Sequence, residues 1–302
     1  MKKRNILLTF YSLLALSVSA QKITLGSCKM KDGGEYKGQM MSGKPHGKGT
    51  TTWKDGDRFE GEYVKGKRQG YGVYTFHDGE KYEGQWMQDH QHGQGTFYFN
   101  NNNKYVGLWY RDDQEGHGIM YYYNGDVYDG QWKQSKRHGK GRYTYKGGAY
   151  YEGEWVDDQK NGRGTFSWGD GSSYEGQWKD NRQQGKGTFR YANGDVYIGS
   201  FNNDAQNGKG IYKFQNGDYF EGQFRDGTRH GEGIARYADG SKFRGHFKDG
   251  KRHGPAIEEN KEGLRFEGTY ADDRRDGRFV EKDRNGNITA QGTYVRGKRQ
   301  VD

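Results

Sequence analysis

Apolar and polar positions recur at a constant spacing along most of this chain. An aromatic residue followed two positions later by glycine, or a close variant, begins at Tyr36, returns at Phe59 and Tyr82, and continues at the same interval up to Phe266. Ten such periods follow one another without an insertion. A further, degenerate repeat begins near Gly292, one residue later than the constant interval would place it. A period of 23 residues predicts a solenoid of tandem repeats rather than one globular core.

Each repeat, counted from its first aromatic residue as position 1, contains two segments that alternate with period two. Positions 1, 3 and 5 are typically aromatic, glycine and aromatic, as in Tyr151, Gly153 and Trp155. Positions 14, 16 and 18 begin with glycine and continue with aromatic residues, as in Gly164 and Phe166. Such alternation predicts half-buried strands. Glycines at positions 12 and 21 predict the turns, so each repeat should be one β-hairpin.

The spacing also predicts how the rings pack. A hairpin centred between positions 9 and 10 places position i opposite position 19 − i. The ring at position 5 would then face glycine at position 14, and the ring at position 16 would face glycine at position 3. We therefore expect rings to lie over bare glycine backbone, in a row shared by neighbouring hairpins. The expected fold is all-β, an elongated single-sheet solenoid of tandem 23-residue antiparallel β-hairpins.

Composition explains why the core has to be aromatic. The chain of 302 residues is only 30% hydrophobic and has a net charge of +9, values that on their own suggest disorder. Its 25 Tyr, 15 Phe and 7 Trp argue against disorder, because disordered chains are poor in aromatic residues. Its 52 Gly argue against helices, since Gly costs about 1 kcal/mol in a helix interior relative to Ala.

The repeat resembles the MORN repeat (membrane occupation and recognition nexus). The resemblance rests on units such as YEGEW at 151–155 followed by NGRGTF at 161–166, and it covers roughly residues 25–300. It implies an elongated, twisted, all-antiparallel β ribbon with a grooved aromatic face. It further implies a binding or scaffolding module, to which phospholipid binding has also been attributed.

The first residues of the chain predict a secretory signal. A basic start at 2–4, an apolar run at 6–18 and a small-residue site ending at Ala20 are typical of a signal peptide cleaved before Gln21. An uncleaved anchor is the alternative. We therefore expect an extracytoplasmic location (periplasmic, outer-surface or secreted) after cleavage, or membrane anchoring if the segment is retained.

Four segments follow from these patterns: a signal peptide at 1–20, an N-terminal half-repeat cap at 21–35, ten tandem MORN repeats at 36–265, and degenerate C-terminal repeats with a cap at 266–302. Cys28, the single cysteine, falls on position 16 of the half-repeat, where we expect a buried structural thiol. Towards the C-terminus, Glu258 and Glu281 replace the aromatic residue at position 16. Terminal repeats need a polar finish, so this predicts a cap, with a distinct contact surface as the alternative.

No pattern predicts catalysis, a metal or a cofactor. The position 11 histidines lie one repeat apart, about 9–10 Å, which is too far for ligands that converge on one zinc ion. Acids at position 2 recur uniformly, which is typical of a solvated face rather than of a catalytic pair. We expect a protein that is not an enzyme, without catalytic or metal-binding residues and without a cofactor. The histidines are His46, His92, His138, His230 and His253.

The aromatic row is the first candidate binding surface. A one-sheet ribbon cannot bury both faces, so part of the row should remain reachable in a groove, and exposed aromatic stripes often mark binding sites. We expect this groove to bind a protein partner or a second ribbon. The candidate groove residues are Trp86, Trp109, Trp132, Trp155, Trp178, Phe97, Phe99, Phe166 and Trp168.

A basic edge is the second candidate. Cations gather before the glycine of position 12, and hairpins would align them along one side of the ribbon. Such a stripe could bind anionic phospholipid at a membrane surface. Solubility and protection of the edge are the alternative interpretation, and nucleic acid is not an expected partner. The residues are Lys67, Arg68, Lys136, Arg137, Lys251, Arg252, Arg274 and Arg275.

Overall fold

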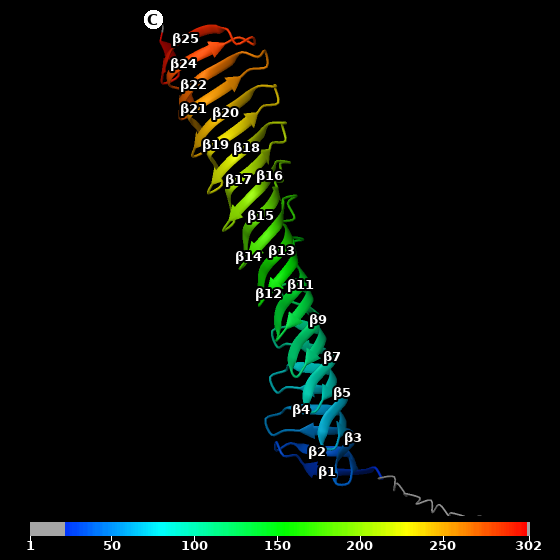
Figure 1. The fold of residues 1–302 in the computed structure, drawn as a ribbon. Helices are drawn as coiled ribbons and strands as arrows, with labels where there is room; N and C mark the ends of the chain where they lie inside the picture. The colour runs from blue at the N-terminus through cyan, green and yellow to red at the C-terminus, as the bar shows by residue number, and fades with distance from the viewer. Residues whose placement is uncertain (1–21, 301–302) are drawn as a thin grey trace, which may run out of the picture. The chain divides into compact units, whose positions relative to one another are not determined.

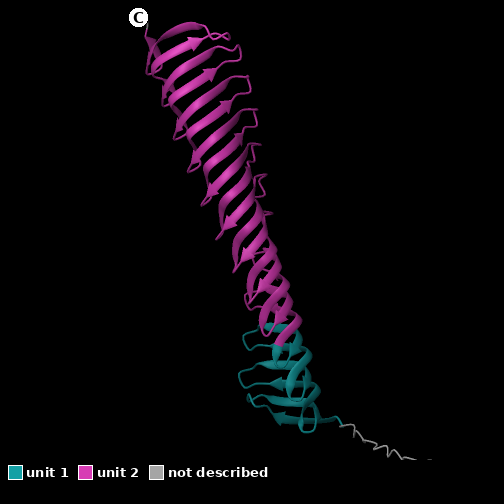
Figure 2. Cartoon of the chain, in the orientation of Figure 1, with its two compact units in different colours: residues 1–90 teal, residues 91–302 magenta. Residues whose placement is uncertain are grey.

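The computed structural model describes residues 22–300. The predicted signal peptide at 1–20 lies outside the described residues. The chain divides into two compact units, one up to His90 and one from Gln91 onward (Figure 2). Each unit consists of β-hairpins that follow one another in chain order (Figure 1). The described residues include no helix that is long and apolar enough to cross a membrane.

Antiparallel pairing of consecutive strands builds each unit, and this confirms the predicted all-β fold of tandem hairpins. The first unit contains β1 (Thr24–Lys29), β2 (Glu35–Met41), β3 (Lys44–Thr52), β4 (Arg58–Val64), β5 (Lys67–Thr75) and β6 (Lys81–Met87). The second contains β7 (His90–Tyr98), β8 (Lys104–Tyr110), β9 (Asp113–Tyr121), β10 (Val127–Lys133), β11 (Lys136–Thr144), β12 (Tyr150–Val156), β13 (Gln159–Ser167), β14 (Ser173–Lys179), β15 (Arg182–Arg190), β16 (Val196–Asn202), β17 (Ala205–Lys213), β18 (Tyr219–Arg225), β19 (Thr228–Arg236), β20 (Lys242–Lys248), β21 (Lys251–Glu259), β22 (Arg265–Ala271), β23 (Arg274–Arg275), β24 (Gly277–Lys282), β25 (Ile288–Val295) and β26 (Lys298–Gln300).

Each hairpin turns at positions 7 and 8, not between positions 9 and 10 as predicted. In the repeat that begins at Tyr151, the turn residues Asp157 and Asp158 have φ values of 46° and 68°. Two consecutive positive φ values are typical of a type I′ turn, whose twist matches that of the flanking strands. Asp and Asn tolerate this conformation better than most residues, which explains why they occupy these positions in many repeats.

The pairing within the hairpin corrects the predicted register. Gly153 lies opposite Gly164 and Tyr151 opposite Phe166, so position i faces position 17 − i in this part of the hairpin. The ring at position 5 therefore does not face the glycine at position 14. The two glycines face each other instead, and they leave a bare patch of backbone on one face of the sheet.

A β-bulge explains why the register could not be predicted. Between the Gly153–Gly164 pair and the Trp155–Lys160 pair, β12 advances by two residues and β13 by four. Because both numbers are even, the alternation of side chains continues unbroken on each strand. Gly162, at position 12, lies in this bulge with a φ of +67°. Position 12 is thus a bulge residue and not the predicted turn, whereas Gly171, at position 21, has a φ of +94° and lies in the loop that joins two repeats.

The position 1 rings are the most deeply buried part of the core, and they lie on the paired glycines. Tyr151 is fully buried, and its hydroxyl donates to the Glu154 carbonyl at 3.0 Å. A methyl group added at Gly164 would lie 2.4 Å from that hydroxyl. The Tyr151 ring also makes edge-on contacts with Trp155 at 5.1 Å and with Trp178 of the next repeat at 5.3 Å. The expected packing of rings over glycines is therefore confirmed, although the covering ring comes from position 1.

Both ends of the described chain adapt this pattern. β1 supplies a half-repeat, in which half-buried Cys28 lies opposite Tyr36 instead of being fully buried. The delayed start of the last repeat is absorbed by a bulge, because Glu281 pairs with Ala290 while Lys282 pairs with Ile288.

Candidate binding surfaces

The five tryptophans of the candidate groove belong to the core. Their exposed fractions are only 4–6%, for Trp86, Trp109, Trp132, Trp155 and Trp178. Several donate the indole N–H to the carbonyl of a glycine in the preceding repeat, as Trp178 does to Gly164 at 3.0 Å. Each tryptophan therefore joins two repeats, and little of its surface is open to a partner.

A second line of rings, at positions 16 and 18, is half-buried and forms what we call the aromatic ladder. Neighbouring ring centroids along it are 4.5–5.9 Å apart. Trp168 is the most open member, at 37% exposure. Phe166 and Trp168 of the candidate groove belong to this ladder. Its members are Tyr122, Tyr143, Tyr145, Phe166, Trp168, Phe189, Tyr191, Tyr212 and Phe214.

Phe97 and Phe99 form a separate pair beyond this ladder. Their centroids are 4.6 Å apart, and Phe97 is 8% exposed. Met120 occupies position 16 of the following repeat, so the line of rings is interrupted there. The ladder thus contains two of the nine predicted groove residues, together with seven tyrosine or phenylalanine side chains that were not singled out.

Carboxylates fix several ladder rings. The Tyr143 hydroxyl donates to Asp126 at 2.7 Å, and the Tyr212 hydroxyl donates to Asp195 at 3.0 Å. Burial and this hydrogen bond raise the pKa of Tyr143 well above its usual range. Burial works against ionisation of Asp126, but hydrogen bonds from the Lys146 amide and Tyr143 still lower the pKa of Asp126. These tyrosines therefore remain neutral donors, held in place by ionised acids.

A hollow of about 350 Å³ lies beside the ladder in the second unit. Its lining combines the rings of Phe189, Tyr191 and Tyr212 with the polar side chains of Gln183 and Gln206. Gln206 donates to the Tyr191 hydroxyl at 2.6 Å. Apolar ring faces and a few fixed polar groups are what a binding pocket for a protein side chain requires.

Four of the eight residues of the predicted basic edge pack against aromatic rings of the fold. The Arg137 guanidinium lies 4.5 Å from the Trp155 ring centroid and donates to Asp158 Oδ1 at 2.9 Å and to the Asp158 carbonyl at 3.1 Å. Stacking on an aromatic face together with hydrogen bonding holds such a cation in place. The arginines at position 10 are therefore structural, namely Arg68, Arg137, Arg252 and Arg275.

The position 9 cations are the exposed remainder of the basic edge. They precede the stacked arginines and point away from the rings. Lys67 has 51% of its side chain exposed, and its contact with Asp89 is long, at 3.9 Å. The four residues are Lys67, Lys136, Lys251 and Arg274.

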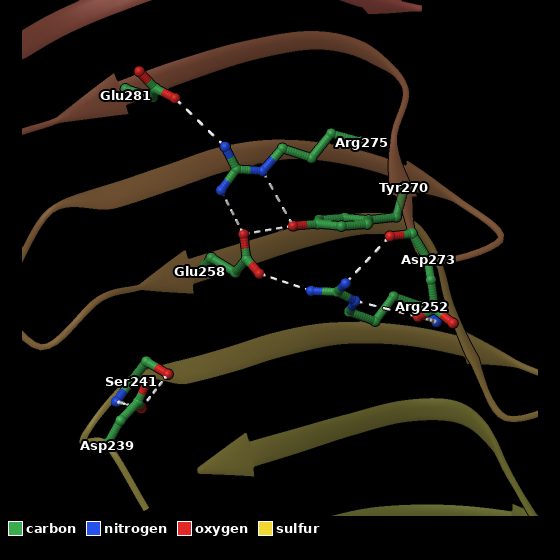
Figure 3. Close-up of polar contacts among 8 residues, drawn as sticks. All are labelled: Asp239, Ser241, Arg252, Glu258, Tyr270, Asp273, Arg275 and Glu281. Atoms are coloured by element: carbon green, nitrogen blue, oxygen red, sulfur yellow. Dashed lines mark hydrogen bonds and ion pairs between the residues drawn. The ribbon is translucent and has the colours of Figure 1, made fainter. Parts of the chain in front are cut away.

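The C-terminal repeats replace the ladder by a cluster of charges (Figure 3). Glu258, at a ladder position, accepts from Arg252 at 2.8 Å, from Arg275 at 2.6 Å and from the Tyr270 hydroxyl at 2.5 Å. Glu281 lies 3.6 Å from the other side of Arg275. Burial raises the pKa of Tyr270 to about 12, and the hydrogen bond to Glu258 contributes to the same shift. The charges pair among themselves, which favours the interpretation of this region as a cap.

The recurring histidines lie in the hairpins without converging. The Nδ1 atoms of His46, His138, His230 and His253 are buried without a hydrogen-bond partner. Within residues 22–300, no three His, Cys, Asp or Glu side chains are arranged to hold a metal ion.

A second, larger hollow lies on the opposite face of the second unit, where the sequence predicted a uniform polar surface. It has a volume of about 1170 Å³ and runs across β15 to β22 over the glycine backbone of positions 3 and 14. One wall is what we call the isoleucine row, formed at positions 2 and 15 by Ile198, Ile211, Glu221, Ile234, Arg244, Ile257 and Glu267. The signal was visible, because four isoleucines stand where other repeats mostly have Glu, Thr or another polar residue.

The fold and these surfaces define a tandem β-hairpin repeat protein. The model of the MORN repeat matches ten consecutive segments, residues 36–58, 59–81, 82–104, 105–127, 128–150, 151–173, 174–196, 197–219, 220–242 and 243–264. The chain therefore belongs to the MORN-repeat family, as its sequence indicated. The boundaries of the two caps remain predictions.

Solved structures add a distant likeness. The TCP10 domain of Danio rerio CPAP, in complex with a peptide of Danio rerio STIL, is 13% identical, with 81% of this chain and 98% of that chain covered and a TM-score of 0.38. The SAS-4 (dCPAP) TCP domain in complex with a proline-rich motif of Ana2 (dSTIL) of Drosophila melanogaster is 16% identical, with 52% and 84% covered and a TM-score of 0.34. Both TM-scores are low, so the likeness does not bear on the function of this chain. The search of curated proteins found no match.

Proposed function

We propose that this MORN-repeat protein is a non-enzymatic scaffold that binds a partner protein through the aromatic ladder. The observation that supports this most directly is the continuity of nine half-buried rings from Tyr122 to Phe214. The buried tryptophans already hold the repeats together, so the ladder is not needed to close the core. Aromatic surface of this kind supplies most of the binding energy in many protein interfaces.

The ladder fits a partner segment with apolar side chains that lie against ring faces. Trp168 is the best anchor because it is the most exposed ring and stacks between Phe166 at 4.7 Å and Phe189 at 5.1 Å. Its rigid neighbours reduce the entropy that binding would cost. Asp126 and Asp195 hold the tyrosines on either side in fixed orientations, so the surface is formed before a partner arrives.

Trp168→Ala tests this proposal. We expect the variant to fold and to bind its partner roughly 30-fold more weakly, since a central tryptophan contributes about 2 kcal/mol or more to an interface. Tagged wild-type protein and variant are compared by quantitative pull-down from the producing cell, and the affinity of the recovered partner is then measured by calorimetry. Tyr123→Ala is the matched control, because Tyr123 is 76% exposed and is not a member of the ladder. Equal binding by wild type and Trp168→Ala contradicts the proposal.

Anionic phospholipid is a second candidate ligand, favoured by the exposure of the position 9 cations. Lys136→Ala is expected to reduce co-sedimentation with phosphatidylserine vesicles by several-fold at low salt, since each cation near an anionic surface contributes about 1 kcal/mol. Arg137→Ala is the comparison, because that guanidinium already stacks on Trp155. Absence of pelleting with these vesicles at low salt removes this candidate.

We also propose that the protein acts outside the cytoplasm after loss of residues 1–20. The support is the charge and apolar pattern of that segment. The intact mass of protein recovered from the producing cell decides the matter, since a chain that retains residues 1–20 contradicts cleavage.

A further inference from the structure

The isoleucine row has an order that is nearly symmetric about Ile234. Its members are direct cross-strand neighbours, from Ile198 and Ile211 through Glu221, Ile234 and Arg244 to Ile257 and Glu267. Reversing the row about Ile234 places Glu221 on Arg244 and Ile211 on Ile257. A surface that matches its own reverse is what a two-fold symmetric interface requires, because residue i of one copy then meets residue j of the other, and j meets i.

We propose that the second face of repeats 174–268 binds a second copy of this chain, with the two-fold axis along β19 at Ile234. The two ribbons then run in opposite directions, and their isoleucine rows pack face to face. This interface lies on the face opposite the aromatic ladder, so it goes beyond the proposed partner binding and leaves the ladder free.

The charges of the row favour a second copy over other occupants. Within residues 22–300, no hydrogen bond or ion pair engages the exposed Arg244 guanidinium. Among the same described residues, the Glu221 carboxylate accepts one hydrogen bond, from the Tyr219 hydroxyl at 2.8 Å. In the symmetric pair, Arg244 of each copy meets Glu221 of the other, so the ion pair forms twice. Between isoleucines, such a pair is partly shielded from water, which strengthens its attraction.

The apolar content and the extent of the surface agree with a dimer. Isoleucines 211, 234 and 257 lie two strands apart, about 9–10 Å, so three apolar contacts alternate with the two ion pairs. The hollow extends across eight consecutive strands, and its lining is comparable to the roughly 20–30 residues that one partner contributes to a standard interface. Packed sheets cross at about 30°, so the contacts nearest Ile234 should dominate.

The opposite wall of the hollow contributes one contact that needs compensation. The axis brings Glu232 of one copy towards Glu232 of the other. His246 Nε2 lies 3.7 Å from Glu232 Oε1 in the same chain, so this carboxylate already has a polar group beside it. Next to the axis on this wall, Gln223 meets His246 and Lys209 meets Pro255, so no like charges oppose each other there.

Charge exchange tests the proposal with the full-length chain. Sedimentation velocity at tens of micromolar protein should show a dimer for the wild type. It should show monomers for Glu221→Arg and for Arg244→Glu, because in each variant like charges face each other twice across the axis. An equimolar mixture of these two variants should form a dimer again. One copy then carries cations at both positions 221 and 244, and the other carries carboxylates at both. Glu152→Arg, the same charge change at position 2 of a repeat outside 174–268, is the control and should remain dimeric.

Each alternative outcome overturns the proposal. The proposal is wrong if the wild type is monomeric at these concentrations. It is also wrong if both single variants remain dimeric. Two monomeric variants that stay monomeric when mixed contradict it as well, provided that circular dichroism and thermal unfolding match the wild type. Trp168→Ala should leave the dimer unchanged, so the failure of partner binding and the failure of self-association can be told apart.

Discussion

Replacing Gly164 by alanine should lower the free energy of unfolding by about 3 kcal/mol, because the added methyl group overpacks a closed core. It would lie 2.4 Å from the Tyr151 hydroxyl and 2.6 Å from two atoms of the ring. The ring cannot withdraw, since it is fully buried, holds a hydrogen bond to Glu154 and touches a tryptophan on each side. Urea unfolding followed by tryptophan fluorescence measures the loss.

Gly147→Ala is the matched control for this prediction. Gly147 lies in a loop between repeats, and a methyl group added there would meet nothing within 4 Å. We expect it to change the unfolding free energy by less than about 0.5 kcal/mol, as is usual for surface substitutions. If both variants unfold at the same urea concentration, the rings are not held on the glycines in the way the structure shows.

The sequence was sufficient for the class of fold because one pattern is repeated many times. Aromatic residues and glycines at fixed positions imposed alternating strands, and the packing of rings over glycines followed from their sizes. The register did not follow, because the bulge at Gly162 leaves the alternation on both strands intact. The pairing of Trp155 with Lys160 could be found only from the structure.

The candidate sites were predictable only in part, for a related reason. Sequence reasoning identified aromatic positions but not which rings the next repeat would cover, so buried Trp155 and half-buried Phe166 were given the same role. It grouped Lys136 and Arg137 as one edge, whereas alternation places their side chains on opposite faces. The second face was averaged over all repeats, which concealed the concentration of isoleucines between Ile198 and Ile257.

The C-terminal charge cluster shows what happens when a ladder position is given a carboxylate. Glu258 stands where most other repeats place an apolar residue, mostly an aromatic ring, and both of its oxygens are occupied by Arg252, Arg275 and Tyr270 (Figure 3). Only 23% of the Glu258 side chain is exposed, so water cannot readily replace these partners. The cluster therefore behaves as a partly buried ion network and not as a surface salt bridge.

Glu258→Ala should consequently destabilise the C-terminal repeats by about 2 kcal/mol, because two partly buried guanidinium groups lose their shared carboxylate. Since neighbouring repeats carry most of the coupling in a solenoid, hydrogen exchange should accelerate in β21 to β24 well before it changes in β12. Glu259→Ala is the control: the Glu259 side chain is 45% exposed, and within residues 22–300 its one ion pair is with Lys242, at 3.3 Å, an arrangement that contributes little to stability. Equal protection of β22 in the two variants would mean that the stacked arginines are held by the rings alone, and the cap would then owe its stability to aromatic contacts such as that between Arg275 and Phe266, at 3.9 Å.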